Sequence, residues 1–310
     1  MTAPAAMPLV SVIIPTHNRA GVVGRAIRSV LAQTYPCTEI IVIDDRSTDN
    51  TPEILATFGD SIKVVRTTGT QGPAAARNSG IARCSGELVA FLDSDDVWQP
   101  HKLAAQVAVF LRRPASLAGV YTGRRTLLAD GAVLDIRPRR GENTFESLCC
   151  RDRIVPSTLV VRRAVLHEVG LFDTRLPACE DWDLLLRIAR RYTFDFIDDI
   201  AVVVDATASN RMSNRSRAVF LATHMILRRF SGRRPSREVL AGYLAIQARE
   251  LFQMERFELA ARYALRSLWL KFDRDEKLAL RTLKRILRRT VIRKLSFWTK
   301  GLALLAHTSD

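Results

Sequence analysis

The chain has 310 residues, of which 47% are hydrophobic and 25% are charged, and its formal net charge is +15. These fractions are typical of a soluble globular protein with a substantial core. No apolar run reaches the ~18 residues that a membrane-spanning helix needs, and the N-terminus lacks the pattern of a secretory signal. The five cysteines are scattered without a CxxC pair, which argues against a disulfide framework or a zinc site and fits a reducing cytosol.

The positive charge is concentrated at one end of the chain. Residues 1–210 contain 24 Lys and Arg and 24 Asp and Glu, so their net charge is zero. Residues 211–310 contain 23 Lys and Arg against 8 Asp and Glu, and therefore carry the whole excess. This change in composition predicts two domains, residues 1–210 and a basic extension at residues 211–310.

The first part of the chain alternates short apolar runs with helical periodicity. Buried strands are expected at residues 9–15, 39–43, 62–65 and 88–92. Helices are expected at residues 23–31, 51–58, 73–83 and 100–112. The alternation predicts an α/β fold, with a mostly parallel sheet flanked by helices on both faces.

After residue 115 the pattern is mixed, and we expect this part to extend the same sheet. Asp130-Gly131 signals a hairpin between residues 119–128 and 132–136. Further strands are expected at residues 157–161 and 194–204, and helices at residues 163–169 and 181–191. The C-terminal extension is expected to be all-helical, with segments near residues 218–230, 237–254, 256–271, 275–290 and 291–305.

Three carboxylates follow the fourth apolar run within four positions. Asp93, Asp95 and Asp96 come directly after Leu88–Leu92. A buried parallel strand ends at the sheet edge where ligands bind in open α/β folds. Because close carboxylates repel one another, we expect a hard divalent cation to bridge them to substrate phosphates. The alternative is that Asp95 and Asp96 cap a following helix.

Polar residues also follow the first and second strands. Pro15-Thr16-His17-Asn18 follows the first strand, and Asp44-Asp45 ends the second. Their hydroxyl, amide and carboxylate groups suit recognition of a base and a ribose. Turn formation and helix capping use the same residue types and are the alternative at each position.

Two further positions carry charge next to an expected helix. Arg77 lies just inside the helix at residues 73–83, where its guanidinium suits a diphosphate, although an ordinary surface arginine would look the same. No P-loop or dinucleotide-binding glycine motif occurs. Glu180-Asp181 precedes another helix, where a carboxylate either acts as a general base or stabilises the helix dipole.

These motifs, in this order and spacing, resemble the family 2 glycosyltransferases over about residues 8–205. The matching stretches are residues 10–16, 44–49, 76–80, 91–96 and 180–182. The resemblance implies the GT-A fold, a UDP-sugar or similar nucleotide-diphospho-sugar donor, a divalent metal (Mn²⁺ or Mg²⁺) and inversion at the anomeric carbon. It also implies a hexosyltransferase-like enzyme that acts on a hydroxyl of a saccharide or lipid-linked acceptor, in cell-surface polysaccharide or glycolipid assembly.

The resemblance implies a role for each matched residue. Those implied to hold the nucleotide sugar are Pro15, Thr16, Asn18, Asp44, Asp45, Arg77, Asp93 and Ser94. Asp95, together with Asp93, is implied to bind the metal, and Asp181, next to Glu180, to be the catalytic base. Inversion in one displacement needs a base on the acceptor side and charge neutralisation on the leaving diphosphate, and two acidic clusters would supply both.

Two features depart from the family pattern. The QxxRW motif and the membrane helices of processive polysaccharide synthases are absent, so a single transfer is expected. Many relatives carry a metal-binding histidine after the last strand, but residues 205–214 contain none, and the next is His224. Asp205, Asn210 or water would have to take its place.

The basic extension offers a further surface. At residues 281–305, basic side chains interleave with apolar ones and are followed by Phe297 and Trp298. Such a surface suits anionic lipids, which contribute ~1 kcal/mol per basic residue, so we expect a cytoplasmic protein that lies peripherally on the inner face of the membrane. A helical bundle with a solvated basic face is the alternative. A nucleic-acid partner is not expected, because no nucleic-acid-binding motif occurs.

Two other functions fit parts of the pattern. A sugar nucleotidyltransferase would need a glycine-rich phosphate loop after the first strand, which residues 15–18 do not provide. A catalytically impaired nucleotide-sugar-binding protein or membrane scaffold would account for the missing histidine.

Overall fold

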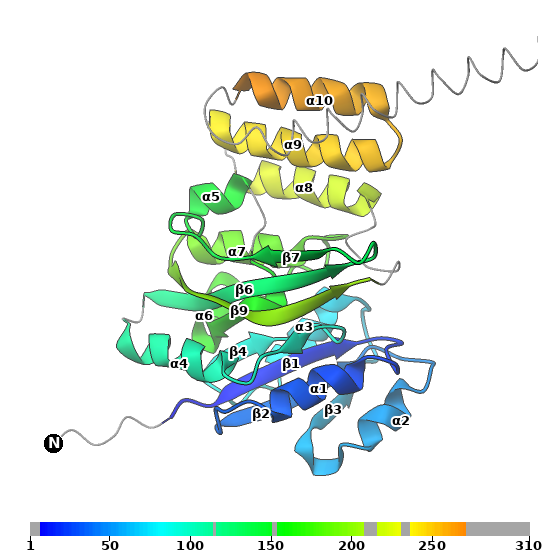
Figure 1. The fold of residues 1–310 in the computed structure, drawn as a ribbon, viewed down its shortest axis with the longest axis vertical. Coiled ribbons are helices and arrows are strands. Elements are labelled where there is room, and N and C mark those ends of the chain that lie inside the picture. Colours follow the sequence, from blue (N-terminus) through cyan, green and yellow to red (C-terminus); the bar gives the residue numbers. More distant parts are fainter. Residues whose placement is uncertain (1–6, 114–115, 151–153, 208–215, 231–235, 271–310) are drawn as a thin grey trace, which may run out of the picture. The chain divides into compact units, whose positions relative to one another are not determined.

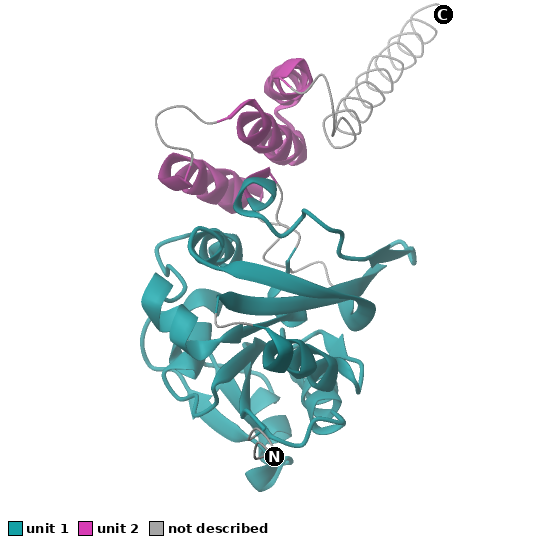
Figure 2. Ribbon diagram, turned by 90° about the vertical axis from the view of Figure 1, so that its left-hand side faces the viewer, with its two compact units in different colours: residues 1–148, 152–214 teal, residues 149–151, 215–310 magenta. Residues whose placement is uncertain are grey.

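The computed structural model describes residues 7–113, 116–150, 154–207, 216–230 and 236–270. The chain divides into two compact units (Figure 2). Unit 1 comprises residues 1–148 and 152–214, and unit 2 comprises residues 149–151 and 215–310. Within the described residues, no helix is both long enough and apolar enough to cross a membrane.

One mixed sheet of nine strands, counted over the described residues, forms the centre of unit 1 (Figure 1). The strands are β1 (Val10–Thr16), β2 (Thr38–Asp44), β3 (Lys63–Arg66), β4 (Leu88–Phe91), β5 (Val97–Trp98), β6 (Leu117–Leu128), β7 (Val133–Ile136), β8 (Leu159–Arg162) and β9 (Thr193–Ala206). Their order is β3-β2-β1-β4-β8-β6-β9-β5, with β7 paired to β6. The strands β3, β2, β1 and β4 are parallel, whereas β8 runs antiparallel to β4 and to β6.

Helices flank this sheet, and most of them contact its strands (Figure 1). They are α1 (Val23–Leu31), α2 (Thr51–Ala56), α3 (Pro73–Ile81), α4 (Lys102–Arg112), α5 (Phe145–Cys150), α6 (Arg163–Val169) and α7 (Glu180–Ala189), with short 3-10 turns at residues 59–61 and 156–158. Helix α3 lies very close to β1. A Cβ atom added at Gly80 would be only 2.5 Å from Cγ2 of Ile13. A larger residue at that position would therefore push α3 away from the sheet.

The structure confirms the predicted α/β fold and the extension of one sheet through the mixed part of the chain. The hairpin at Asp130-Gly131 joins β6 to β7 as expected. Two short elements were not predicted, β5 and α5, because two and six residues are too few to show a period. Asp95 and Asp96 precede β5, so their predicted alternative role as helix caps is wrong.

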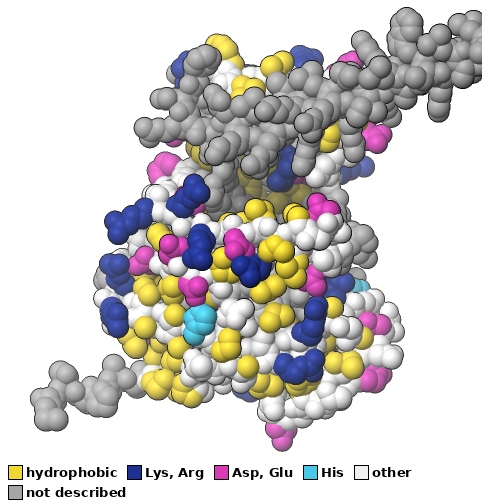
Figure 3. Space-filling model, viewed as in Figure 1, with side chains coloured by type: hydrophobic (Ala, Val, Ile, Leu, Met, Phe, Trp, Pro, Cys, Tyr) yellow, Lys and Arg dark blue, Asp and Glu magenta, His cyan; other side chains and the backbone are white. Residues whose placement is uncertain are grey.

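A second difference concerns residues 157–161, which were expected to form a strand. Residues 156–158 form a 3-10 turn instead, and β8 begins only at Leu159. On the face shown in Figure 3, basic and acidic side chains of unit 1 are interspersed, which agrees with the zero net charge of residues 1–210.

The described part of unit 2 is helical. It contains α8 (Ser216–Phe230), α9 (Arg237–Gln253) and α10 (Phe257–Leu270), and α9 packs against both of the others. The helices expected at residues 275–290 and 291–305, and with them the basic surface at residues 281–305, lie outside the described residues.

A carboxylate ties the N-terminal ends of the parallel strands together. Glu39 on β2 accepts hydrogen bonds from the Ser11 hydroxyl of β1 at 2.6 Å, the Ser85 N–H at 2.6 Å and the Lys63 ammonium of β3 at 2.8 Å. Burial alone would raise the pKa of Glu39, but these hydrogen bonds outweigh it and lower the pKa to about 2.

We predict that Glu39→Gln lowers the free energy of unfolding by about 2 kcal/mol at neutral pH, because the neutral amide cannot reproduce these charge-assisted bonds. The folded-state pKa of Glu39 lies below that of the unfolded chain, about 4.3. The stabilisation should therefore be present above the unfolded value and disappear as the pH falls toward the folded one. Denaturant unfolding of both proteins across this range tests the prediction.

The control is Glu53→Gln, which changes an exposed carboxylate of α2 and should leave stability within about 0.5 kcal/mol. A stability difference at Glu39 that did not change with pH would contradict the assignment.

Candidate active site

The parallel strands bring three of the predicted motifs to one edge of the sheet. Thr16 at the end of β1 pairs with Asp44 at the end of β2. On the other side of β1, Ile13 pairs with Phe91, and the Leu92 N–H donates to the Ile13 carbonyl at 3.0 Å. The residues that follow β1, β2 and β4 therefore lie together at the edge where ligands bind in open α/β sheets.

Asp45 is fixed from two sides at this edge. Its Oδ1 accepts from the Thr67 hydroxyl at 2.6 Å, and its Oδ2 accepts from the Gly72 N–H at 2.8 Å. Gly72 has a φ of 111°, a backbone conformation that favours glycine. Asp44 accepts from the Ser47 N–H at 2.9 Å and lies 3.8 Å from the Arg66 guanidinium.

The end of β1 combines a turn with an unsatisfied hydroxyl. Asn18 has a φ of 52°, and its side-chain oxygen accepts from the N–H groups of Thr48 at 2.8 Å and Asp49 at 3.4 Å. Asn18 thus forms a turn, which was the alternative to nucleotide recognition at this position. The Thr16 hydroxyl is buried and has no hydrogen-bond partner within the described residues, so it is a polar group that a ligand would satisfy.

Arg77 on α3 joins the two acidic clusters. Its Nη2 donates to Oδ1 of Asp93 at 2.8 Å, and its Nη1 donates to Oε1 of Glu180 at 2.7 Å. The guanidinium carbon lies 5.4 Å from the centre of the Phe172 ring. The Arg77 side chain is only 6% exposed, against 31% for Asp93. The guanidinium therefore binds carboxylates in the protein interior.

The charges around Arg77 account for its ionisation. Burial would lower the pKa of the guanidinium, but the carboxylates of Asp93, Glu180 and Asp181 outweigh that effect and raise the pKa above its ordinary value. Arg77 is therefore a permanent cation that holds Asp93, which follows β4, near the acidic start of α7.

Ser157 fixes the loop that contains the first acidic cluster. Its hydroxyl accepts from the Asp93 N–H at 3.1 Å and donates to Oδ2 of Asp96 at 2.6 Å. Its carbonyl accepts from the Trp98 indole N–H at 2.8 Å. Ser157 is fully buried and 61 residues from Asp96 in the sequence. This role could not be predicted from the sequence, because residues 157–161 have only a strand-like pattern.

A buried lysine lies behind this loop. The Lys102 ammonium lies 3.9 Å from the centre of the Trp98 ring and donates to Gln106 at 2.7 Å. Gln106 in turn donates to the carbonyls of Val120 at 2.6 Å and Thr158 at 3.0 Å. Burial lowers the pKa of Lys102 well below its usual range. This network connects α4 to β6 and to the turn that carries Ser157.

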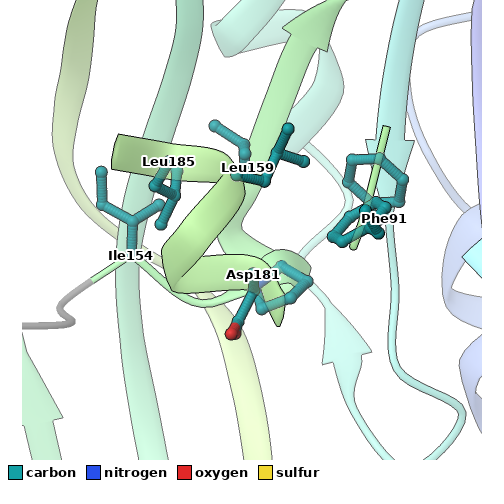
Figure 4. Close-up of a pocket in the computed structure, with 8 residues that line it drawn as sticks. Phe91, Ile154, Leu159, Asp181 and Leu185 are labelled. Carbon is teal, nitrogen blue, oxygen red and sulfur yellow. The ribbon is translucent and has the colours of Figure 1, made fainter. Parts of the chain in front are cut away.

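Asp181 stands at the start of α7, beside an apolar hollow (Figure 4). Its Oδ1 accepts from the Trp182 N–H at 2.8 Å, and the preceding turn is shaped by Cys179, which has a φ of 57°. The hollow has a volume of about 230 Å³, which includes space open to solvent. Its lining consists of Phe91, Ile154, Pro156, Leu159, Phe172, Asp181, Leu184 and Leu185. In Figure 4 the Asp181 carboxylate points away from Leu159 and Leu185.

Asp93 and Asp95 are the two carboxylates that the resemblance implied as ligands of a divalent metal. Among the described residues, no three His, Cys, Asp or Glu side chains gather as a metal site would require. Asp205, expected as a substitute for the missing histidine, accepts instead from Arg25 at 3.1 Å and from the Thr207 hydroxyl at 2.6 Å. Asn210 lies outside the described residues. Two carboxylates still fit Mg²⁺ or Mn²⁺, which commonly take their remaining ligands from substrate phosphates and water.

The sequence-predicted site residues thus fall into two groups that share one edge. Asp93, Arg77 and Glu180 are in direct contact, and Asp181 lies close enough to affect the pKa of Arg77. The residues of the second group surround the ends of β1 and β2: Pro15, Thr16, Asn18, Asp44 and Asp45. Sequence reasoning missed Thr67, Gly72 and Ser157, whose partners are distant in the chain.

The fold and these motifs agree with the comparisons to known proteins. Residues 11–152 match the family model for glycosyl transferase family 2. The glucosyltransferase WfgD of Escherichia coli is 42% identical over 183 residues, which is 59% of this chain and 70% of WfgD. The name of WfgD gives UDP-Glc and an α-D-GlcNAc-diphosphoundecaprenol as its substrates. An uncharacterised glycosyltransferase of Rickettsia felis is 32% identical over 203 residues, or 63% of this chain. The chain spans only 34% of that relative's length.

Two solved structures share the fold. TarS residues 1–349 of S. aureus, in complex with UDP-GlcNAc, superpose with a TM-score of 0.57 at 20% identity, covering 90% of this chain and 81% of TarS. The Pyrobaculum calidifontis mannosyltransferase PcManGT, in complex with GDP-Man and Mn²⁺, gives a TM-score of 0.56 at 19% identity, covering 98% and 82%. The chain belongs to glycosyltransferase family 2 and has the GT-A fold.

We predict that Arg77→Gln lowers the free energy of unfolding by about 3 to 5 kcal/mol, because it leaves two carboxylates without their buried cation. Arg83→Gln, which changes an exposed arginine just after α3, is the matched control and should have little effect. Thermal melting of both variants measures the difference. Adding Glu180→Gln to Arg77→Gln should recover part of the loss, and no recovery would contradict a charge effect.

Ser157→Ala should weaken binding of UDP in the presence of Mn²⁺ about tenfold, because the acidic loop loses two hydrogen bonds that involve Asp93 and Asp96. The matched control is Thr158→Val, which removes a neighbouring hydroxyl bond to the Val155 carbonyl at 2.8 Å. Both variants should lower the melting temperature, but only Ser157→Ala should change the affinity in calorimetry. Equal losses of affinity would show a general packing effect.

Proposed function

We propose that this protein is a metal-dependent, inverting glycosyltransferase that moves a sugar from a UDP-sugar to a hydroxyl of a saccharide or lipid-linked acceptor. The observation that carries the proposal is the contact of Arg77 with both Asp93 and Glu180. This contact places the acidic cluster that ends β4 near the acidic cluster that starts α7. A single displacement needs two such groups, one for the leaving diphosphate and one for the attacking hydroxyl.

The donor side would consist of residues at the ends of β1, β2 and β4. In this proposal Asp45 and the buried Thr16 hydroxyl face the nucleoside, with Pro15, Asn18, Asp44 and Ser94 shaping the surrounding turns. Arg77 acts by holding Asp93 in place, since its guanidinium is buried among carboxylates. Asp95, with Asp93, would hold Mn²⁺ or Mg²⁺ against the diphosphate. The metal would neutralise charge on the leaving group.

The acceptor side would use Asp181 as the general base. Glu180 is paired with Arg77 at 2.7 Å, and in this proposal its carboxylate serves to hold the guanidinium. The acceptor oxygen forms its bond to the anomeric carbon as the bond from that carbon to the diphosphate oxygen breaks. The hydroxyl proton passes to Asp181, UDP leaves, and the configuration at the anomeric carbon inverts.

The relatives suggest where this reaction takes place. WfgD is named for a diphosphoundecaprenol-linked acceptor, and a teichuronic acid biosynthesis glycosyltransferase of Bacillus subtilis is also similar. By analogy we propose a lipid-linked acceptor in cell-surface polysaccharide assembly, reached from the cytoplasmic face of the membrane. The basic residues 281–305 would contribute to that peripheral location.

We predict that Asp181→Asn lowers kcat by about 10²- to 10⁴-fold while leaving UDP affinity almost unchanged, because the amide keeps the shape but cannot take a proton. Isothermal calorimetry with UDP and Mn²⁺, together with a transfer assay over a panel of UDP-sugars, measures both quantities. The control is Asp198→Asn, a 66% exposed carboxylate outside the proposed site. A large loss of UDP affinity in Asp181→Asn would move Asp181 out of the base role.

Assays of the wild-type protein also distinguish the proposed function from the alternative ones. Metal-dependent UDP binding without donor hydrolysis or transfer would favour the nucleotide-sugar-binding scaffold. Release of pyrophosphate from a nucleoside triphosphate and a sugar phosphate would instead show a nucleotidyltransferase.

A further inference from the structure

Helix α10 buries its small residues and exposes its large apolar ones. Ala260, Ala264 and Ser267 are fully buried, and the Ser267 hydroxyl donates to the Ala241 carbonyl of α9 at 2.7 Å. The opposite side of the helix has Leu259 at 40%, Leu265 at 54% and Trp269 at 72% exposed. A helix of a water-soluble bundle normally turns its large apolar residues inward. The outward side of α10 therefore has the composition of a contact surface.

Two arginines lie on the same side of the helix. Arg262 and Arg266 are exposed and follow the spacing of Leu259, Leu265 and Trp269 around the helix. Neither arginine forms an ion pair with any residue that the structure describes. We call the five residues Leu259, Arg262, Leu265, Arg266 and Trp269 the outer face of α10. It combines apolar side chains, a tryptophan and two arginines, and the exposed Glu258 lies one turn before Arg262 on the same side of the helix.

We propose that the outer face of α10 docks on an anionic membrane surface. Leucines and a tryptophan enter the boundary between headgroups and acyl chains, and arginines meet the lipid phosphates. This combination matches the side-chain chemistry of the outer face. The proposal concerns binding alone and does not depend on transfer activity.

Charge argues against two other occupants. Residues 271–310 contain 11 Lys and Arg against 4 Asp and Glu, so this segment would bring further positive charge toward Arg262 and Arg266. A second copy of the chain, docked through the same face, would oppose the arginines of the two copies. An anionic lipid surface supplies the opposite charge.

The test uses the full-length chain and vesicles of phosphatidylcholine, with or without anionic phosphatidylglycerol. We expect binding to the anionic vesicles, weakening as salt is added. The double variant Leu265→Ser, Trp269→Ser should bind at least about tenfold more weakly, because it removes two large side chains from the apolar contact. The double variant Arg262→Gln, Arg266→Gln should lose affinity for anionic vesicles and much of the salt dependence.

Leu111→Ser is the matched control, since Leu111 is a 57% exposed leucine on α4 of unit 1. It should leave vesicle binding unchanged. Circular dichroism and thermal melting establish that each variant is folded, which is expected because every substituted residue is exposed. A blue shift of the fluorescence on vesicle binding that is lost in Trp269→Phe would place this tryptophan in the lipid.

Three outcomes would overturn the proposal. Binding that is equal in the wild type and in both double variants would assign the membrane contact to residues 271–310. No binding to any vesicle would remove the membrane as a partner. Self-association of the wild type that is lost in the Leu265→Ser, Trp269→Ser variant, without vesicle binding, would make the outer face a contact between copies.

Discussion

The site depends on one buried cation. Arg77 is placed by α3, which lies close to β1 because Gly80 has no side chain to meet Ile13. From there its guanidinium reaches Asp93 after β4 and Glu180 at the start of α7, which are 16 and 103 residues away in the chain. Without this cation the carboxylates of the two clusters would repel one another and would not stay in one place. The proposed chemistry therefore rests on an ion-pair network that is structural in character.

Polar side chains are hydrogen-bonded to different extents at the two ends of the parallel strands. At the N-terminal ends of the strands, Glu39 is held by Ser11, Lys63 and Ser85 and has a strongly lowered pKa, which serves stability. At the C-terminal ends, Asp93 keeps a partly exposed carboxylate, and Thr16 keeps a buried hydroxyl without a partner in the described residues. Fully satisfied polar groups rigidify a fold, whereas unsatisfied ones at a ligand-binding edge indicate a site.

In unit 2, helix α10 packs through small side chains and leaves larger apolar ones exposed. Helix α9 is buried along most of its length, and α10 packs on it through small side chains. This close packing leaves the large apolar residues of α10 outside, next to arginines. Two of the basic residues of the last third of the sequence, Arg262 and Arg266, thus lie on this side of α10. An enzyme whose acceptor is attached to a lipid would benefit from such a surface.

The sequence by itself determined most strands and helices, the basic extension and the family, because each depends on local periodicity, composition or short motifs. It also predicted Asp93, Asp95 and Asp181 as candidate site residues and showed that residues 205–214 lack a histidine. Only the tertiary structure decided that Arg77 binds carboxylates, that Ser157 fixes the acidic loop and that Asp205 pairs with Arg25. These contacts join residues that are 16 to 180 positions apart. Local patterns do not encode such pairs, because their geometry arises from how the strands and helices pack.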